Sequence, residues 1–290
     1  MKRLIHDCDN TMGVPGCDVD DGLANLYLLG RRDAEILGIT TVFGNSDLRT
    51  VHESTSGLID SLGKNDIPVL KGSANREQLK SEAASFIVDT VNSDIGHVSI
   101  LATGPLTNLR AAHLIDPGIL EKVDEIVIMG GTTEPLVING RLLKELNLTC
   151  DPLATECVLR NGKNVSVITG NACLDAFFAR SDFEARLSAG RSDSIERIRQ
   201  ACSPWFERMR NEFGVAGFYN WDVVAAVRLM EPQLFTEIPT PVYLGVESLA
   251  FGALDTAKDA GENARVINLP RIADVGGLVN GVYSSWLRLP

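Results

Sequence analysis

The sequence predicts an α/β fold, with a mostly parallel central sheet and helices on both faces. Short apolar runs alternate along the chain with longer segments of helical periodicity, and this rhythm is typical of parallel sheets covered by helices. In addition, 44% of the 290 residues are hydrophobic, which is sufficient for a large core. Because we find no repeat, low-complexity stretch or linker, we expect residues 1–290 to form a single domain.

The expected strands are short apolar runs bounded by polar or turn-forming residues. They are Arg3–His6, Ile36–Phe43, Val98–Ala102, Glu125–Met129, Val165–Thr169 and Val242–Gly245. The expected helices follow most of these strands, and they are Gly22–Leu29, Leu48–Leu62, Leu106–Leu114, Pro152–Arg160 and Val223–Met230. Residues 179–214 have little strand character, so we expect a helical excursion there, with helices Asp182–Ser188 and Ser192–Asn211.

Composition narrows the range of functions. The formal net charge of −11 argues against binding DNA or RNA through the phosphate backbone, but it leaves uncharged small molecules such as nucleosides open. The six cysteines show no CxxC pairing, so a zinc site is not expected and reduced thiols are. Because the chain has neither a signal peptide nor an apolar run of about 18 residues, we expect a soluble cytoplasmic protein without membrane contact.

The most informative feature is a cluster of carboxylates at the turn after the first strand. Five aspartates lie within fifteen residues, and they are Asp7, Asp9, Asp18, Asp20 and Asp21. Carboxylates at this density repel one another, and a hard cation such as Ca²⁺ or Mg²⁺ relieves that repulsion. Alternatively, the last three aspartates cap a helix, although capping does not explain Asp7 and Asp9.

Two families share part of this pattern. The segment Asp7-Cys8-Asp9-Asn10-Thr11 resembles the DxDxT motif of haloacid-dehalogenase-type phosphatases, in which Asp7 would attack phosphorus. The same region also resembles the DxDxxxDD signature of nucleoside hydrolases, with Asp9 on the strand and Asp20-Asp21 opening the helix. Later segments favour the second resemblance, because a phosphatase would also need a lysine and a further acidic pair in defined contexts.

Four later segments match nucleoside hydrolase motifs in order along the chain. They are Thr40–Asn45 (TTVxGN), Thr103–Asn108 (TGxLTN), Met129–Gly131 (MGG) and Glu145–Pro152 (ExNxxxDP). A fifth, Trp221-Asp222, opens an apolar helix and matches the aspartate that binds calcium in the family. Taken singly, Asn45 is also typical of a turn, Asp151 of a helix cap, and Asp222 of an N-cap.

The resemblance implies a nucleoside-hydrolase-like, Rossmann-related fold and Ca²⁺-dependent hydrolysis of the N-glycosidic bond of purine or other ribonucleosides. The implied calcium ligands are Asp9, Asp21, Asp222 and the carbonyl of Thr103, and the implied catalytic residues are Asp9, as general base, and Asn147. The implied substrate-binding residues are Asp20, Asn45, Met129, Asn139, Glu145, Asn147 and Trp221. Analogy with the family also suggests a homo-oligomer, either a dimer or a tetramer.

The chain departs from the family in two places. The spacing from Asp9 to Asp20 is lengthened by an insert, residues 12–18, which we expect at the mouth of the pocket. Relatives usually carry a longer lid after their third strand, whereas here Leu70–Asn75 leads almost directly into a helix. Trp221 is expected to stack on the leaving base or to pack in the core, and Trp205 and Phe206 are expected mainly in the core. A phosphatase using Asp7 and a non-catalytic nucleoside-binding protein remain the alternatives.

Overall fold

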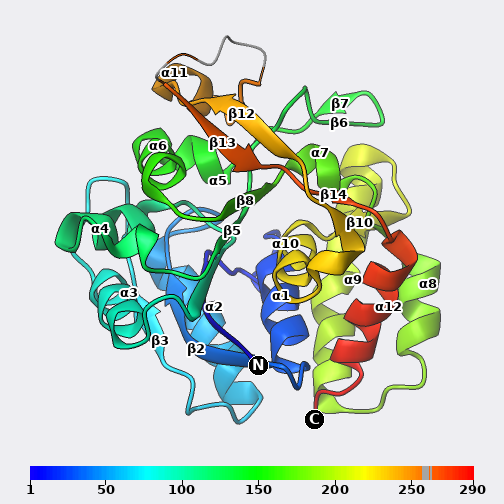
Figure 1. Ribbon diagram of the computed structural model, residues 1–290. Coiled ribbons are helices and arrows are strands. Elements are labelled where there is room, and N and C mark those ends of the chain that lie inside the picture. Colours follow the sequence, from blue (N-terminus) through cyan, green and yellow to red (C-terminus); the bar gives the residue numbers. More distant parts are fainter. Residues whose placement is uncertain (257–260, 262) are drawn as a thin grey trace.

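The computed structural model describes residues 1–256, 261 and 263–290, and an eight-stranded sheet forms its centre (Figure 1). The strand order is β12-β13-β8-β5-β4-β1-β2-β3. Neighbouring strands pair in parallel, except that β12 is antiparallel to β13. The strands are β1 Lys2–Cys8, β2 Ala34–Thr41, β3 Val69–Lys71, β4 Val98–Ala102, β5 Ile126–Met129, β8 Val165–Ile168, β12 Pro239–Tyr243 and β13 Ala264–Asn268. The predicted mostly parallel sheet is confirmed.

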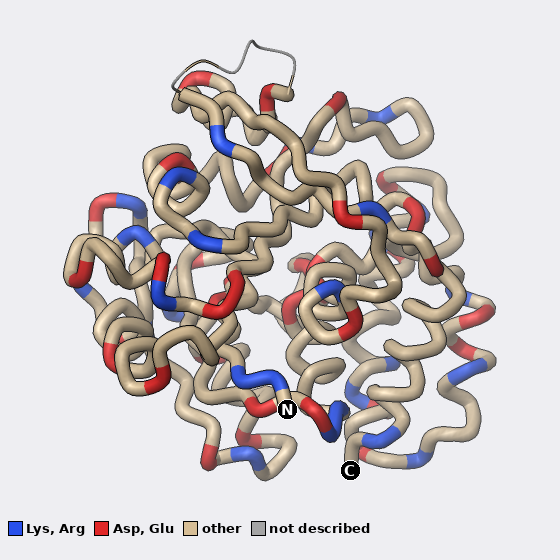
Figure 2. The backbone as a smooth tube through the Cα atoms, in the orientation of Figure 1, with Lys and Arg blue, Asp and Glu red and all other residues tan. Residues whose placement is uncertain are grey.

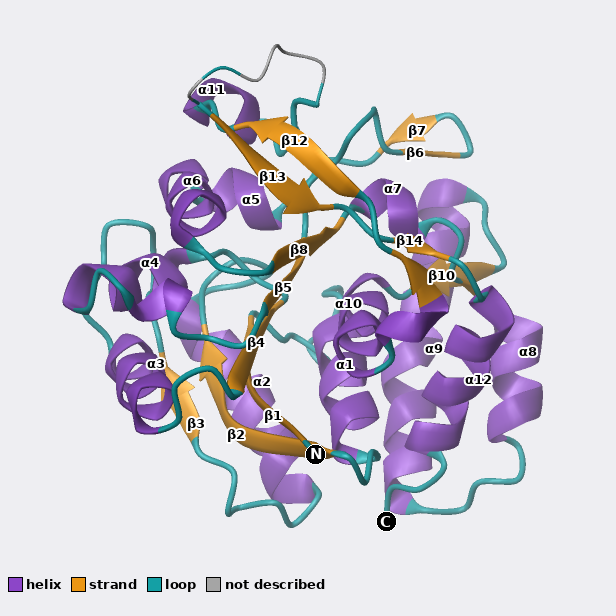
Figure 3. Cartoon of the chain, in the orientation of Figure 1, coloured by secondary structure: helices purple, strands orange, loops and turns teal. Residues whose placement is uncertain are grey.

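Helices cover both faces of this sheet (Figure 3). One face carries α3 Glu82–Ser93, α4 Thr107–Ile115, α6 Pro152–Asn161 and α11 Val246–Leu249. The other face carries α1 Asp20–Leu29, α2 Leu48–Ser61, α10 Trp221–Met230 and α12 Val275–Trp286, with α8 Arg180–Leu187 and α9 Asp193–Phe213 outside them. No helix in the described part of the chain has both the length and the apolar content needed to cross a membrane.

Short elements complete the fold. These are the helices α5 Asn147–Cys150 and α7 Gly170–Cys173, the strand pairs β6 Val137–Ile138 with β7 Arg141–Leu142, β9 Phe177–Ala179 with β10 Gly217–Tyr219, and β11 Phe235–Thr236 with β14 Arg271–Ile272, and the 3-10 turns Ile119–Glu121 and Pro232–Leu234. Lysines and arginines are spread among acidic residues around the molecule (Figure 2).

Most predicted elements agree with the structure to within three residues at each end, and β4 agrees at both ends. The helical excursion is confirmed as α8 and α9. The predicted elements did not include β3, β13 or α12. The expected helix does not follow Leu70–Asn75 almost directly, because residues 72–81 form a ten-residue connection between β3 and α3.

The position of β1 determines where polar groups gather. The chain passes from β1 outward through β2 and β3, and then returns to place β4 on the other side of β1. In doubly wound sheets, such a reversal leaves a crevice at the carboxyl ends of the two strands, where ligands bind. The ends of β1 and β4 remain paired here, as the hydrogen bond from the Thr103 amide to the Asp7 carbonyl oxygen at 2.8 Å shows.

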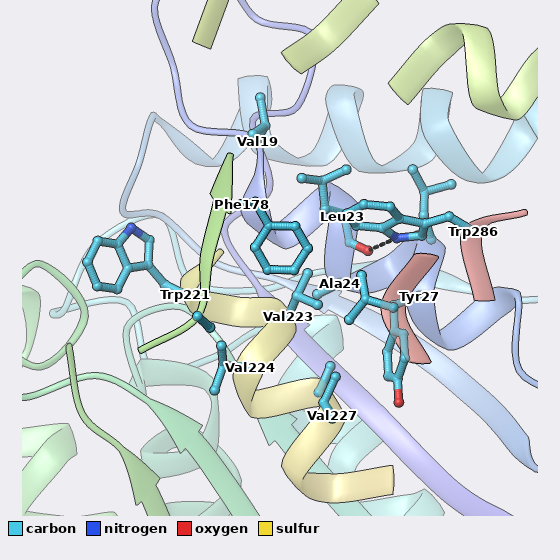
Figure 4. Packing of buried hydrophobic residues seen from close by; sticks show 14 of the residues in the cluster. Val19, Leu23, Ala24, Tyr27, Phe178, Trp221, Val223, Val224, Val227 and Trp286 are labelled. Carbon is cyan, nitrogen blue, oxygen red and sulfur yellow. Dashed lines mark hydrogen bonds between the residues drawn. The ribbon is translucent and has the colours of Figure 1, made fainter. Parts of the chain in front are cut away.

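Packing between helices brings two first turns together at this crevice. Helix α1 packs against α10 and α12, and the indole Nε1 of Trp286 donates to the Leu23 carbonyl at 3.1 Å (Figure 4). Leu23 and Val223 are fully buried at this contact. Because the two helices pack side by side, the acidic residues of their first turns face the same crevice.

Candidate functional site

A cavity of about 430 Å³ opens at the carboxyl edge of the sheet, a volume typical of small-molecule sites. Asn45 after β2, Thr103 after β4 and Met129 at the end of β5 line it, as the rule for parallel sheets requires. Of the residues predicted to form the site, eight line the cavity, and they are Asp20, Asn45, Thr103, Met129, Glu145, Asn147, Trp221 and Asp222.

The acidic residues converge at the bottom of this cavity. Carboxylate oxygens of Asp20, Asp21 and Asp222 lie within 4.8 Å of one another. Asp9 and Asp21 are buried behind the lining, and the Asn45 side-chain amide lies 3.4 Å from Asp9 Oδ1 and 3.5 Å from Asp21 Oδ2. Carboxylates from the residue after β1 and from the first turns of α1 and α10 therefore form one cluster.

The helix-capping interpretation of these aspartates is wrong. The N-cap residues are Val19 for α1 and Asn220 for α10, and neither helix has a side-chain cap hydrogen bond. Asp222 Oδ1 is buried, and within the part of the chain that the structure describes it has no hydrogen-bond partner. By contrast, Asp151 caps α6 as predicted, because its carboxylate accepts from the Ala154 amide at 3.0 Å.

The electrostatics of the cluster favour a bound cation. Among the described residues, no lysine or arginine forms an ion pair with Asp9, Asp20, Asp21 or Asp222. Burial raises the pKa of Asp9 to about 7 and that of Asp20 to about 6, and it raises the pKa values of Asp21 and Asp222 well above their ordinary range. An all-oxygen donor set with this much uncompensated charge fits a hard divalent cation.

Neutral side chains hold the cluster in place. Thr103 Oγ1 donates to Asp21 Oδ1 at 2.6 Å and also contacts His6 Nε2 at 2.8 Å. Asn25 Oδ1 lies 2.9 Å from the other ring nitrogen of His6. His6 lies in no recognisable motif, but in the structure it is a buried support for the cluster.

The loop after β2 covers Asp9 closely. The Asn45 amide donates to Asp9 Oδ2 at 2.6 Å. A Cβ atom on Gly44 would overlap that same carboxylate, so glycine is the residue that allows this approach. This contact explains in physical terms why the segment ends in Gly-Asn.

Asn147 and Glu145 have mostly structural partners in this structure. Asn147 Nδ2 donates to the carbonyls of Thr103 at 2.8 Å and Met129 at 3.1 Å. The Glu145 carboxylate accepts from the amides of Gly131, Leu148 and Thr149. Both side chains are therefore fixed in position where they line the cavity.

Asn139 is the one predicted site residue that the structure places elsewhere. It lies at the turn of the exposed β6–β7 hairpin in the left-handed region, with φ of 48°. Its side-chain amide donates to the Phe213 carbonyl at 2.9 Å, and it does not line the cavity. Asn139 instead connects the hairpin to the end of α9.

The phosphatase alternative is overturned by the position of Asp7. This side chain is fully buried and does not line the cavity. Its Oδ1 accepts hydrogen bonds from Thr40 at 2.5 Å and Asn108 at 2.7 Å. A carboxylate held this way beneath the sheet edge cannot reach a substrate phosphorus atom.

The upper part of the cavity is formed largely by residues that sequence analysis did not assign to the site. Trp221, a predicted site residue, lines it, and Trp205 lies on the same lining while it also belongs to the buried core, where it was mainly expected. Phe206 does pack in the core, with its ring 4.9 Å from that of Phe218. The insert contributes Gly16, Cys17 and Asp18, which confirms its expected place at the pocket.

Helix α9 supplies the largest missed set. Its residues Trp205, Arg208, Met209 and Glu212 all line the cavity. Their spacing of i, i+3, i+4 and i+7 places them on one helical face. That stripe of mixed aromatic and charged residues is the signal in the sequence that would have identified them.

The sequence resembles those of known enzymes. The family model for inosine-uridine preferring nucleoside hydrolases matches residues 4–274. Uridine nucleosidase 1 from Arabidopsis thaliana is 30% identical over 263 residues, which cover 81% of this chain and 76% of that protein. The inosine-uridine preferring nucleoside hydrolase of Crithidia fasciculata is 28% identical over 196 residues, 58% of this chain and 59% of its own.

Solved structures resemble the fold as a whole. A plant nucleoside hydrolase superposes with a TM-score of 0.86 at 22% identity, covering 100% of this chain and 99% of its own. A purine-preferring ribonucleoside hydrolase from Gardnerella vaginalis gives a TM-score of 0.84 at 22% identity, covering 99% of each chain. These likenesses concern the fold, whereas the family match rests on the sequence. The chain therefore belongs to the inosine-uridine preferring nucleoside hydrolase family, metal-dependent enzymes that hydrolyse N-glycosyl bonds.

Proposed function

We propose that this enzyme hydrolyses the N-glycosidic bond of ribonucleosides, purine nucleosides among them, and that it depends on Ca²⁺. The observation that carries the proposal is the buried carboxylate cluster, which has no cationic partner among the described residues, at the bottom of a cavity whose wall includes Trp221. A hard cation and a ribose fit the acidic end of this cavity, and a planar base fits the aromatic end.

The donor set supports the choice of metal. Asp9, Asp21, Asp222 and the Thr103 carbonyl would hold the ion, and the unpartnered Oδ1 of Asp222 is a ready ligand. Calcium takes six to eight oxygen ligands, so water and ribose hydroxyls complete the shell. When bound, such an ion supplies positive charge that favours deprotonation of the attacking water.

The protein's own side chains then act on water and sugar. Asp9 takes the proton of the attacking water, a role worth about 10²–10⁴-fold. Asp20, Asn45 and Asn147 orient the ribose through its hydroxyls. The surrounding carboxylates stabilise the positive charge that develops on the ribose ring in an oxocarbenium-like transition state.

Trp221 supports activity on purines. Its indole lies at the first turn of α10 and points away from the packed side chains of α1 and α12 (Figure 4). An indole in this place offers a stacking surface for a leaving base. Relatives include uridine nucleosidases by name, so we propose activity on both base classes.

A substrate panel tests the proposal. Purified enzyme is incubated with inosine, guanosine, uridine, cytidine and p-nitrophenyl riboside, and ribose is measured as reducing sugar. We expect ribose release that EDTA abolishes and that added Ca²⁺ restores, and we expect none from Asp9→Ala. Binding of nucleosides without ribose release, or full activity of Asp9→Ala, would refute the proposed function.

A further inference from the structure

Arg208 occupies an unusual place in the cavity wall. It lies on α9 beside Trp205, with its guanidinium carbon 5.0 Å from the centre of that indole ring. Its Nε donates to Glu212 at 2.9 Å, and its Nη1 donates to the Gly16 carbonyl of the 12–18 insert. Arg208 thus joins the insert to α9 above the cavity.

These contacts orient the guanidinium, and with respect to residues 1–256, 261 and 263–290 they leave some of its donors unused. A guanidinium carries five N–H donors, and the two bonds to Glu212 and Gly16 occupy two of them. The side chain is 40% exposed and lines the cavity together with Trp221. The cation is therefore fixed at the aromatic end with donors to spare.

In the proposed reaction, negative charge develops on the departing base, and positive charge at the aromatic end of the cavity would stabilise it. Hydrolysis breaks the C1′–N bond, whose electron pair stays on the base, while the water oxygen bonds to C1′ and its proton passes to Asp9. The departing base is thus an anion until it takes a proton from solvent, and Asp9 later returns its own proton to solvent. No histidine lines the cavity within the described residues, and the carboxylates there oppose negative charge.

The lining has one other cation among the described residues. Lys144 comes directly before Glu145, whose carboxylate is fixed by backbone amides at the ribose end. Arg208, beside Trp205, is the cation at the end that receives the base. An arginine cannot donate its proton outright at neutral pH, so it acts by charge and hydrogen bonding.

We infer that Arg208 is a catalytic residue that stabilises negative charge on the departing nucleobase, as the electrostatic substitute for a general acid. This inference rests on the proposed nucleoside hydrolysis. Preorganised donors of this kind contribute about 10²–10³-fold to kcat. Partial exposure of Arg208 screens its charge, so we expect the lower end of that range.

Leaving-group dependence tests the inference. Arg208→Met keeps the stem of the side chain and removes its charge, and Arg208→Lys restores a cation. We expect Arg208→Met to lower kcat on inosine by about 100-fold and to leave kcat on p-nitrophenyl riboside nearly unchanged, because nitrophenolate departs without assistance. Arg208→Lys should recover part of the loss on inosine. Arg210→Met is the matched control on the same helix, since Arg210 pairs with Glu207 outside the cavity.

The outcomes separate the two proposals. Equal losses on both substrates would mean that Arg208 acts only by holding the insert, and they would overturn the inference. No loss on either substrate would overturn it as well. Activity on p-nitrophenyl riboside shows that each variant is folded. If the wild-type enzyme releases ribose from neither substrate, the proposed function fails, and the variants are not the cause.

Discussion

Replacing Asp9 by asparagine should stabilise the metal-free protein while it abolishes activity. Burial raises the pKa of Asp9 from 3.8 to about 7, so the folded state holds a proton that the unfolded state releases between these values. Stability is therefore lost as the pH rises from about 4 to about 7, and the whole penalty is present above pH 7. The change in the pKa of Asp9 from 3.8 to about 7 corresponds to roughly 4 kcal/mol in the free energy of unfolding.

The asparagine side chain of this variant carries no charge and avoids the penalty. It keeps one acceptor for the Asn45 amide, which donates to Asp9 at 2.6 Å, and the loss of the second acceptor costs about 1 kcal/mol. We therefore expect Asp9→Asn to raise the free energy of unfolding by roughly 3 kcal/mol near pH 8 in EDTA, and to leave it unchanged or slightly lower near pH 4.

Urea unfolding at both pH values, with EDTA or with Ca²⁺, measures this effect. The wild type should gain about 4 kcal/mol from calcium at a thousand times its Kd, and Asp9→Asn should gain much less. Asp60→Asn is an exposed control on α2 and should show neither effect. A variant that is less stable than the wild type near pH 8 in EDTA, or that keeps the full calcium gain, would refute the reasoning.

Further predictions concern the supports of the cluster and the base wall. Gly44→Ala should destabilise the protein by about 1–3 kcal/mol and abolish activity, because the added Cβ would overlap Asp9. Gly57→Ala, where α2 has open space around the glycine, should instead stabilise the protein by about 0.5–1 kcal/mol. Urea unfolding measures both effects. Trp221→Ala should raise KM for purine nucleosides by about tenfold, since stacking contributes about 1–3 kcal/mol per base, and an unchanged KM would contradict stacking. Burial lowers the pKa of His6 to about 4, so the free energy of unfolding falls as the pH drops from about 6.5 to about 4. In EDTA, His6→Gln should avoid roughly 3 kcal/mol of this acid destabilisation. Parallel acid unfolding curves for the wild type and the variant would contradict this prediction.

The fold was largely predictable because local patterns and tertiary structure agree along most of the chain. Apolar runs such as β4 form strands buried on both faces, and their periodicity is clear. Helix α12 was missed because Gly276, Gly277 and Gly281 lower its helix propensity. Its stability comes from Trp286 and Tyr283, which are buried against other elements, and such long-range packing is not visible in a local pattern.

Some residues of the cavity lining could be predicted from their place directly after strands, and others, such as Glu145 and Asn147, from their resemblance to family motifs. Asn45 and Thr103 are found by their place after strands, because the carboxyl ends of parallel strands meet at one edge. Arg208 and Met209 reach the cavity only because α9 folds back over the sheet edge. Asn139 shows the converse case, in which a residue in a suitable motif context is held by Phe213 outside the cavity.

The position of β1 between β2 and β4 links the stability of this protein to its function. At that point the sheet buries Asp9 beside two helix starts, and the resulting charge is uncompensated within the described residues. Buried carboxylates without a partner destabilise the folded state, so the acidic cluster lowers the free energy of unfolding of the metal-free protein. A cation that binds only the folded state raises the free energy of unfolding again. The strength of metal binding and the destabilisation of the metal-free protein should therefore rise and fall together among variants of the cluster.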